Sequence, residues 1–150
     1  MPMVLWGMTA IMWVMTGLLA QPPAAQATPS LDFEFFQTQV QPIFLASRPG
    51  YTRCVVCHSG VGGSSFLQPL AEGATTWTDE ESRQNFDRIM RLVTPGQPTQ
   101  SRLLMHPLEP EAGGDEFHNG GRQFTSQDDP DFRTISAWVL GGETLDGPGR

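Results

Sequence analysis

The sequence of 150 residues predicts an all-α domain. Apolar residues recur at helical spacing in three segments, 31–45, 78–93 and 130–140. The two later segments begin with recognisable helix caps and end at proline or glycine. The residues between them are rich in glycine, proline and serine, and hardly any run alternates in the way that a β-strand does. These observations favour helices joined by long loops.

The first predicted helix covers residues 31–40. Ser30 is its candidate N-cap, and acidic residues in the first turn suit the positive end of the helix dipole. Pro42 is expected to interrupt or kink the helix, although residues 43–45 continue its apolar character. Three residues at positions i, i+3 and i+7 share an apolar face, which we assign to the core: Phe33, Phe36 and Val40.

The second predicted helix begins at Thr78. Thr78 and Glu81 match the S/T-x-x-E capping box, in which each side chain satisfies a backbone N–H of the first turn. The helix continues to segment 94–98, where two prolines and a glycine stop it. Its apolar face consists of Phe86, Ile89, Met90 and Val93. We therefore place Met90 in the core.

Two further helices are expected toward the C-terminus. A short one spans residues 101–105 and ends before Pro107. The last one has Asp129 as N-cap and Pro130 at its first position, and it ends at the glycines 141–142. Its apolar residues are Phe132, Ile135 and Val139, with Trp138 beside them. We expect the first and last helices, which both carry aromatic residues, to pack against each other.

A Cys-x-x-Cys-His motif lies between the first two helices, at residues 54–58. This motif is the signature of covalent c-type haem attachment. Two cysteines three residues apart lie on one helical turn, so Cys54 and Cys57 can both form thioethers to the vinyl groups of one haem. His58 then offers its imidazole to the iron as the proximal ligand. We therefore predict a single covalent haem c as the cofactor.

The motif has three other interpretations, which are a chance occurrence, half of a zinc site, and a dithiol redox pair. A structural zinc site needs four ligands, usually from two paired clusters, and the chain has no further cysteine. A thioredoxin-like dithiol is expected in a βαβ setting, and no strand pattern surrounds the motif. Covalent haem is the interpretation that uses both cysteines and the histidine.

The N-terminal residues predict export. Residues 4–20 form an apolar run. This run is slightly shorter than a transmembrane helix, which needs about 20 residues. Residues 25–27, Ala-Gln-Ala, resemble a signal-peptidase site. We interpret residues 1–27 as a signal peptide, 28–142 as one domain and 143–150 as a flexible tail. Because no Lys or Arg precedes the apolar run, an uncleaved membrane anchor is the alternative.

The chain is acidic, with a formal net charge of −7, and all nine basic residues are arginine. A nucleic-acid partner is disfavoured, because binding to phosphates needs a basic face. Redox partner proteins with a basic docking patch are favoured, because complementary charge steers protein encounters. The acidity is equally consistent with a role in solubility alone.

The order of these features resembles a monohaem c-type cytochrome of class I, in which an N-terminal helix leads into CxxCH and a C-terminal helix crosses the first. The chain is more narrowly similar to planctomycete-type cytochrome c domains, over about residues 31–142. The similarity rests on the motif and on four flanking stretches: 40–44 (VQPIF), 95–104 (PGQPTQSRLL), 118–121 (HNGG) and 138–141 (WVLG). It implies a cytochrome c-like helical fold, electron transport, and haem attachment outside the cytoplasm, hence a periplasmic or otherwise exported protein.

The distal iron ligand departs from ordinary class I chains, because their Met-Pro pair is missing and residues 118–121 stand in its place. His118 is the predicted distal ligand, since its glycine-flanked loop lets the backbone approach a flat cofactor closely. Met105 is the alternative and would raise the reduction potential relative to a bis-histidine site. His106, which could instead cap the short helix, and an open distal site are further alternatives.

Other residues are assigned supporting roles. Arg102 and Arg122 could pair with the haem propionates, because arginine matches a carboxylate bidentately. Surface ion pairs with nearby acidic residues are the slightly favoured alternative for both arginines. Phe66 could close over the haem from the proximal side, and the Pro69 carbonyl could accept a hydrogen bond from His58.

The function predicted from these features is transfer of single electrons, either free or as a subunit of an exported redox complex. We assign no catalytic residues, because no acid–base constellation is evident beside the motif. A haem-based gas sensor or a peroxidase-like enzyme with an open distal site is the alternative. An interaction module without haem is the third possibility.

Overall fold

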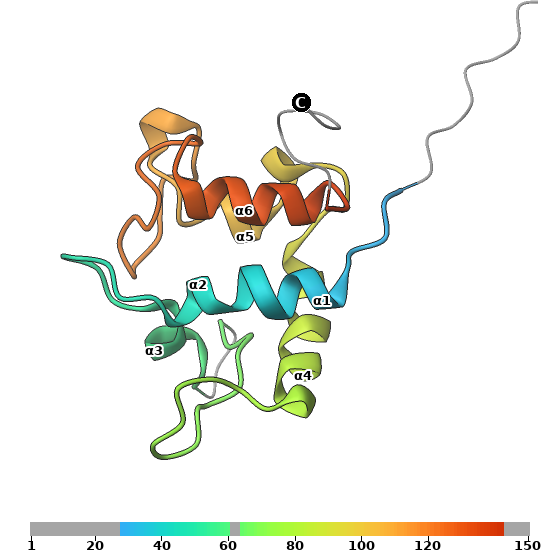
Figure 1. Cartoon of the computed structure of the whole chain (residues 1–150). Coiled ribbons are helices and arrows are strands. Elements are labelled where there is room, and N and C mark those ends of the chain that lie inside the picture. The colour runs from blue at the N-terminus through green and yellow to red at the C-terminus, as the bar shows by residue number, and fades with distance from the viewer. Residues whose placement is uncertain (1–27, 61–63, 143–150) are drawn as a thin grey trace, which may run out of the picture.

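A computed structural model describes residues 28–60 and 64–142 of the chain (Figure 1). These residues form helices and loops without a sheet, which confirms the prediction of an all-α domain. No helix among them is long and apolar enough to cross a membrane. The predicted signal peptide or anchor at residues 1–27 and the predicted tail at residues 143–150 lie outside the described residues.

The helical segments expected from the sequence are all present. In chain order they are α1 Phe33–Phe35, a π-helical turn Phe36–Val40, α2 Gln41–Leu45, α3 Cys54–His58, α4 Asp79–Ile89, α5 Arg102–Met105 and α6 Pro130–Val139. Short 3₁₀ turns occupy Met90–Leu92, Pro98–Gln100 and Pro110–Ala112. The motif itself therefore forms a short helix of its own.

α1, the π-helical turn and α2 follow one another as a continuous helix (Figure 1). The helix starts at Asp32, whose carboxylate accepts a hydrogen bond from the Phe35 amide at 2.5 Å. The prediction of Ser30 as N-cap is wrong, because Asp32 caps equally well and lies where the extended backbone turns into the helix. Pro42 lies in the first turn of α2, so the expected interruption takes the form of the preceding π-helical turn.

The capping box that begins α4 is confirmed. The Glu81 amide donates to the Thr78 hydroxyl at 3.3 Å, and the Thr78 amide donates to the Glu81 carboxylate at 2.9 Å. The assignment of Met90 to the core is wrong, because its relative exposure is 36%. The chain passes into a 3₁₀ turn at Met90, which has fewer residues per turn, so the buried face of α4 ends at Ile89.

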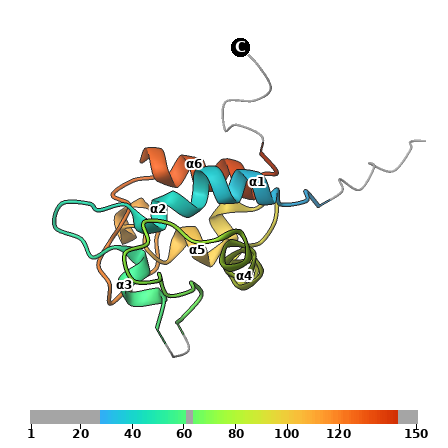
Figure 2. The ribbon, with the colours of Figure 1, turned by 60° about the horizontal axis from the view of Figure 1, so that its bottom comes forward.

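α6 lies beside the N-terminal helix and closes the core (Figures 1 and 2). Its predicted N-cap, Asp129, is confirmed, since the carboxylate accepts hydrogen bonds from two backbone amides of the first turn. Trp138 is fully buried, and its ring centroid lies 5.3 Å from that of Phe36. The indole N–H donates to the Asp32 carbonyl at 2.8 Å. The first and last helices therefore pack against each other, as expected.

Arg48 ties the turn before α3 to the start of α6. Its guanidinium donates to both carboxylate oxygens of Asp129, at 3.0 and 3.1 Å, and also pairs with Asp131. Burial disfavours the charge of Asp129, but the hydrogen bonds from Arg48 and from the helix backbone keep its pKa below the ordinary value. The side-chain amide of Gln123 adds a link by donating from Nε2 to the Thr52 carbonyl at 3.1 Å. These contacts hold the segment that leads into the motif.

Candidate functional site

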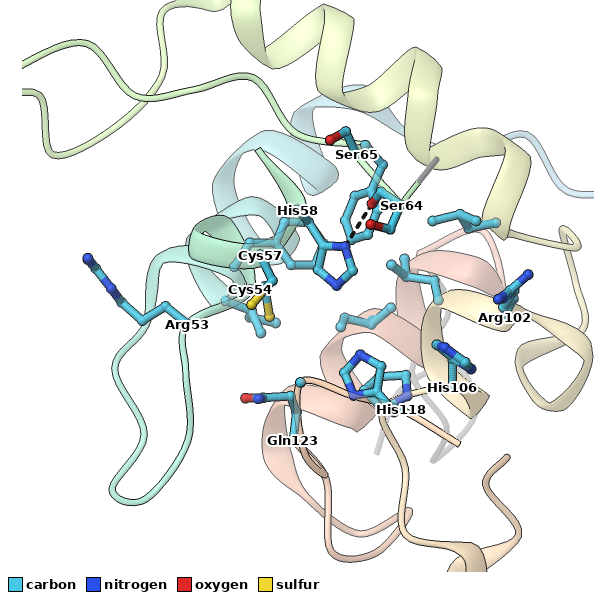
Figure 3. A pocket seen from close by; sticks show the side chains of 18 of the residues that line it. Arg53, Cys54, Cys57, His58, Ser64, Ser65, Arg102, His106, His118 and Gln123 are labelled. Atoms are coloured by element: carbon cyan, nitrogen blue, oxygen red, sulfur yellow. Dashed lines mark hydrogen bonds between the residues drawn. The ribbon is translucent and has the colours of Figure 1, made fainter. Parts of the chain in front are cut away.

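A pocket of about 460 Å³ lies between α3 and the C-terminal half of the described chain. Its wall is mostly apolar, and its volume is typical of ligand and cofactor sites, which span about 300–1,000 Å³. The apolar side chains come from segments far apart in the sequence: Ile43, Phe44, Phe66, Leu92, Leu103, Phe124 and Ile135. In Figure 3, α3 supplies one side of the pocket, and α5 and the loop around His118 supply the opposite side.

Both cysteines of the motif line this pocket as free thiols. α3 places them on one helical turn, with their sulfurs close together in Figure 3. Burial raises the pKa of the Cys54 thiol to about 11, so this sulfur is a protonated thiol at neutral pH. The dithiol oxidoreductases lower the pKa of a cysteine to generate a thiolate, and Cys54 shows the opposite shift. The environment therefore disfavours the interpretation as a dithiol redox pair.

His58 points into the pocket from the end of α3 (Figure 3). Its Nδ1 lies 2.8 Å from the carbonyl oxygen of Ser64, so the neutral imidazole donates from Nδ1 and keeps the lone pair of Nε2 free. The prediction that Pro69 supplies this carbonyl is wrong. Residues 64–67 lie against the motif, where the Phe66 and Leu67 amides both donate to the His58 carbonyl at 3.0 Å.

Phe66 also fixes the plane of the His58 imidazole. The two rings are stacked, with centroids 4.4 Å apart and an interplanar angle of 30°. Phe66 lines the pocket on the same side as His58, which is the position expected from the sequence. The hydrogen bond from Nδ1 and this stacking contact together restrict rotation of the imidazole about its side-chain bonds.

His118 faces His58 across the pocket (Figure 3). The two ring centroids are 6.2 Å apart, and the ring planes differ by 14°. The Nδ1 of His118 is hydrogen-bonded to the Gly121 carbonyl, which again leaves Nε2 as the free nitrogen. Burial lowers the pKa of His118 although the bond to Gly121 acts in the opposite direction, so its imidazole is neutral at pH 7. The free Nε2 lone pairs make both imidazoles potential metal ligands.

Gly120 allows the His118 ring its position. A Cβ on Gly120 would lie 3.2 Å from Cε1 of that ring, which is closer than ordinary van der Waals contact. The absence of a side chain at Gly120 therefore lets the loop fold tightly around the imidazole.

The other two candidate distal residues occupy different environments. Met105 is half-buried and packs against the hydrophobic core, and it does not line the pocket. His106 does line the pocket, and its ring lies 4.9 Å from that of His118 in an edge-to-face arrangement. His106 is also the C-cap residue of α5, as the sequence suggested, and its Nδ1 lies 2.9 Å from the Asp115 carboxylate.

The charged residues that line the pocket are all cationic. Arginine contributes four lining side chains, whereas no aspartate or glutamate of residues 28–60 and 64–142 lines the pocket. These arginines are Arg53, Arg88, Arg91 and Arg102. This clustering of arginine around the pocket contrasts with the whole chain, in which acidic residues outnumber basic ones by 16 to nine. The site is therefore an apolar pocket with a cationic rim, which suits an apolar ligand that carries anionic groups.

Arg122 has a different role from either one proposed on sequence grounds. Its guanidinium donates to the backbone carbonyls of His106 and Leu108, at 3.1 and 3.2 Å, and to that of Glu116. Arg122 is absent from the pocket wall, and these carbonyls occupy its donors instead of a nearby carboxylate. Both interpretations of Arg122 are therefore wrong, and its function is to brace the loop that carries His118.

Sequence reasoning missed the arginines at positions 88 and 91. They are three residues apart at the end of α4 and in the following 3₁₀ turn, so they project from the same side. That spacing was visible in the sequence. The motif lies about 30 residues earlier in the chain. The two arginines line the same pocket as the motif only because of the way α4 packs in the folded domain.

Among the described residues, no cluster of three or more His, Cys, Asp or Glu side chains is arranged to hold a metal ion. Comparison with protein-family models, with curated protein sequences and with solved structures found no match to this chain.

Proposed function

We propose that this chain is an exported monohaem c-type cytochrome that carries single electrons, either free or as a subunit of a redox complex. The observation that carries the proposal is the pair of imidazoles that face each other across a pocket also lined by both motif cysteines. In this proposal Cys54 and Cys57 attach the haem, and His58 and His118 ligate its iron from opposite sides.

The distance between the two imidazoles supports a metal ion between them. A bond from a metal to an imidazole nitrogen is about 2 Å long, and the ring centroid lies roughly 1 Å beyond that nitrogen. Two imidazoles on opposite sides of one ion therefore have centroids about 6 Å apart. The observed separation of 6.2 Å between His58 and His118 agrees with this value.

The hydrogen bonds of both imidazoles also suit ligation. Histidines that bind metals donate their second N–H to a carbonyl or carboxylate, which fixes the tautomer and the ring orientation. Ser64 provides such a carbonyl for His58, and Gly121 provides one for His118. Met105 has no comparable position, because it does not line the pocket. This contrast supports His118 over Met105 as the distal ligand.

The cationic rim supports an anionic cofactor in the same pocket. A haem carries two propionates, and arginine recognises carboxylates through two parallel hydrogen bonds. Arg88, Arg91 and Arg102 line the pocket from α4, the following turn and α5, whereas the two cysteines line it from α3. These three arginines would pair with the propionates of a haem held at Cys54 and Cys57.

When bound, the haem supplies reversible one-electron chemistry at its iron. The chain would hold it through Cys54 and Cys57 and through the imidazoles of His58 and His118, of which that of His118 is neutral, and the apolar wall would exclude water. The helical frame, in which the terminal helices pack together beside the motif, supports a cytochrome c-like arrangement. The apolar run and Ala-Gln-Ala site in residues 1–27 support export to the periplasm or beyond.

The alternative function is a gas sensor or a peroxidase-like enzyme. One observation favours it, namely that His106 and Asp115 form a hydrogen-bonded pair beside His118 on the distal side of the pocket. Such a pair could act as a general acid and base if no residue occupied the distal side of the iron. His118 stands between this pair and the His58 side of the pocket, so we favour the electron carrier.

Binding of carbon monoxide distinguishes these functions. With both axial positions filled by His58 and His118, the reduced protein is expected not to bind carbon monoxide and to show a low-spin visible spectrum in both oxidation states. The measurement is a spectrum of reduced protein before and after addition of the gas. A shift of the Soret band on addition would reject the electron carrier in favour of the sensor or enzyme.

The double substitution of Arg91 and Arg102 by glutamine is expected to lower the reduction potential by a few tens of millivolts. Nearby cations disfavour the more positive oxidised iron, and because both arginines are exposed, solvent screening limits their joint contribution to about 1 kcal/mol. Redox titration of the two proteins measures the difference. Arg83→Gln is the matched control, because this guanidinium packs over the Phe33 ring, 4.1 Å from its centroid. An equal potential in the double variant and the control would contradict the propionate assignment.

A further inference from the structure

Phe117 is an exposed aromatic residue directly before His118. Its relative exposure is 78%, compared with 60% for Val56 and lower values for the other exposed large apolar residues of the described chain. Aromatic side chains are enriched at protein–protein interfaces, where they provide a large contact area at a low cost in conformational entropy. An isolated exposed apolar residue is common, so the surroundings of Phe117 decide whether it is functional.

The loop that presents Phe117 is firmly attached to the domain. The Asp115 amide donates to the Met105 carbonyl at 2.9 Å, and the Arg122 guanidinium donates to the Glu116 carbonyl. The two residues before Phe117 are thus bonded to the body of the protein, on the side where α5 ends. Phe117 is therefore held in an exposed position by the fold, which reduces the entropy that would be lost on binding a partner.

A second exposed aromatic residue lies against the same loop. A Cβ on Gly121 would be 3.7 Å from the ring of Tyr51, which is itself 37% exposed. In both Figure 1 and Figure 2, the turn that carries Tyr51 and the loops that follow α5 lie at the same end of the molecule. The surface next to His118 therefore has more than one aromatic contact point.

The charge around Phe117 is negative. The segment from residue 102 to residue 122 contains two arginines, of which Arg122 is half-buried and donates to backbone carbonyls. It contains four acidic residues: Glu109, Glu111, Asp115 and Glu116. Asp115 and Glu116 immediately precede Phe117, and both are exposed. This surface has the opposite sign from the arginine rim of the pocket, so a partner that docks on it must present basic groups.

We propose that Phe117, with the exposed Tyr51 and the acidic residues of its loop, forms a docking surface for a redox protein that presents a basic patch around an apolar depression. The inference rests on the proposed function, since it places the partner beside the distal ligand His118. Acidic residues steer the encounter, and Phe117 fixes the orientation by filling the depression. Electrons then leave or enter through the distal loop, close to His118.

A chemically defined electrode tests this surface with the full, haem-loaded protein. The probe is a gold electrode coated with a mixed monolayer of amine-terminated and methyl-terminated alkanethiols, which mimics a basic patch with apolar depressions. Phe117→Ser is expected to lower the interfacial electron-exchange rate about tenfold, and Glu116→Gln about threefold. Raising the salt concentration is expected to slow the wild type and to reduce the effect of Glu116→Gln.

The matched controls are Met90→Ser, at another exposed apolar residue, and Glu72→Gln, at an exposed acid in a different loop. Both controls are expected to keep the wild-type rate. Haem content and electron exchange with a small quinone mediator are measured first for every variant. Wild-type protein without haem would overturn the proposed function and this inference with it. Loaded Phe117→Ser protein that matches the controls on the electrode would overturn the docking surface alone.

Discussion

Replacement of both Cys54 and Cys57 by serine is expected to abolish covalent haem attachment completely. A serine hydroxyl does not add to a vinyl group under conditions in which a thiol does, so no thioether can form at either position. The exported double variant should therefore lose the haem-specific peroxidase stain on a denaturing gel and the pyridine haemochrome spectrum. The loss should be essentially total, since no other cysteine exists in the chain.

Val56→Ala is the matched control for this experiment. Val56 lies between the two cysteines and is 60% exposed, so its truncation changes the motif helix without removing a sulfur or a buried contact. The control is expected to retain full haem content. Retention of a covalent haem in the double serine variant would contradict the assignment of the two cysteines.

The second large effect is expected from His118→Ala. Removal of this imidazole takes away the ring whose centroid lies 6.2 Å from that of His58. Met105 does not line the pocket, and His106 lines it but is bonded to the Asp115 carboxylate through Nδ1. The reduced protein should change from a low-spin to a high-spin spectrum and should acquire binding of carbon monoxide. Haem content should be unchanged, since the variant keeps Cys54, Cys57 and His58, the residues proposed to attach and ligate the haem.

Met105→Leu is the matched control for His118→Ala, because it removes the thioether sulfur while it preserves the volume of a core side chain. The control should keep the low-spin spectrum. An unchanged low-spin spectrum in His118→Ala would refute the ligand assignment. The additional variant His106→Ala would then show whether the neighbouring imidazole or Met105 is the true ligand.

The helices could be predicted from the sequence because their determinants are local. The capping box at Thr78 and the N-cap at Asp129 are defined by neighbouring residues, and the structure confirms both. The prediction of Ser30 was wrong because Ser and Asp are equally favoured at the N-cap, and Asp32 lies only two residues later. Only the path of the backbone selects between them. Met90 failed because a change from α to 3₁₀ geometry shifts the buried face within a single turn.

The motif could be identified from the sequence because its residues are adjacent, whereas its surroundings could not. The carbonyl that orients His58 belongs to Ser64 instead of Pro69, and the composition of a loop does not determine which of its carbonyls meets the imidazole. The arginines at positions 88 and 91 reach the pocket only through the packing of α4. The position of His118 opposite His58 likewise depends on tertiary packing between segments far apart in the sequence, and on a loop that Arg122 braces through the His106 and Leu108 carbonyls.

One measurement tests the central claim most directly, namely the intact mass of the purified, exported protein together with its pyridine haemochrome spectrum. The account predicts a polypeptide heavier by the mass of one haem, with the haem retained after denaturation and acid extraction. It also predicts a haemochrome spectrum typical of two thioether links. A chain with the mass of the polypeptide alone, or one whose haem is removed by acid extraction, would contradict the account.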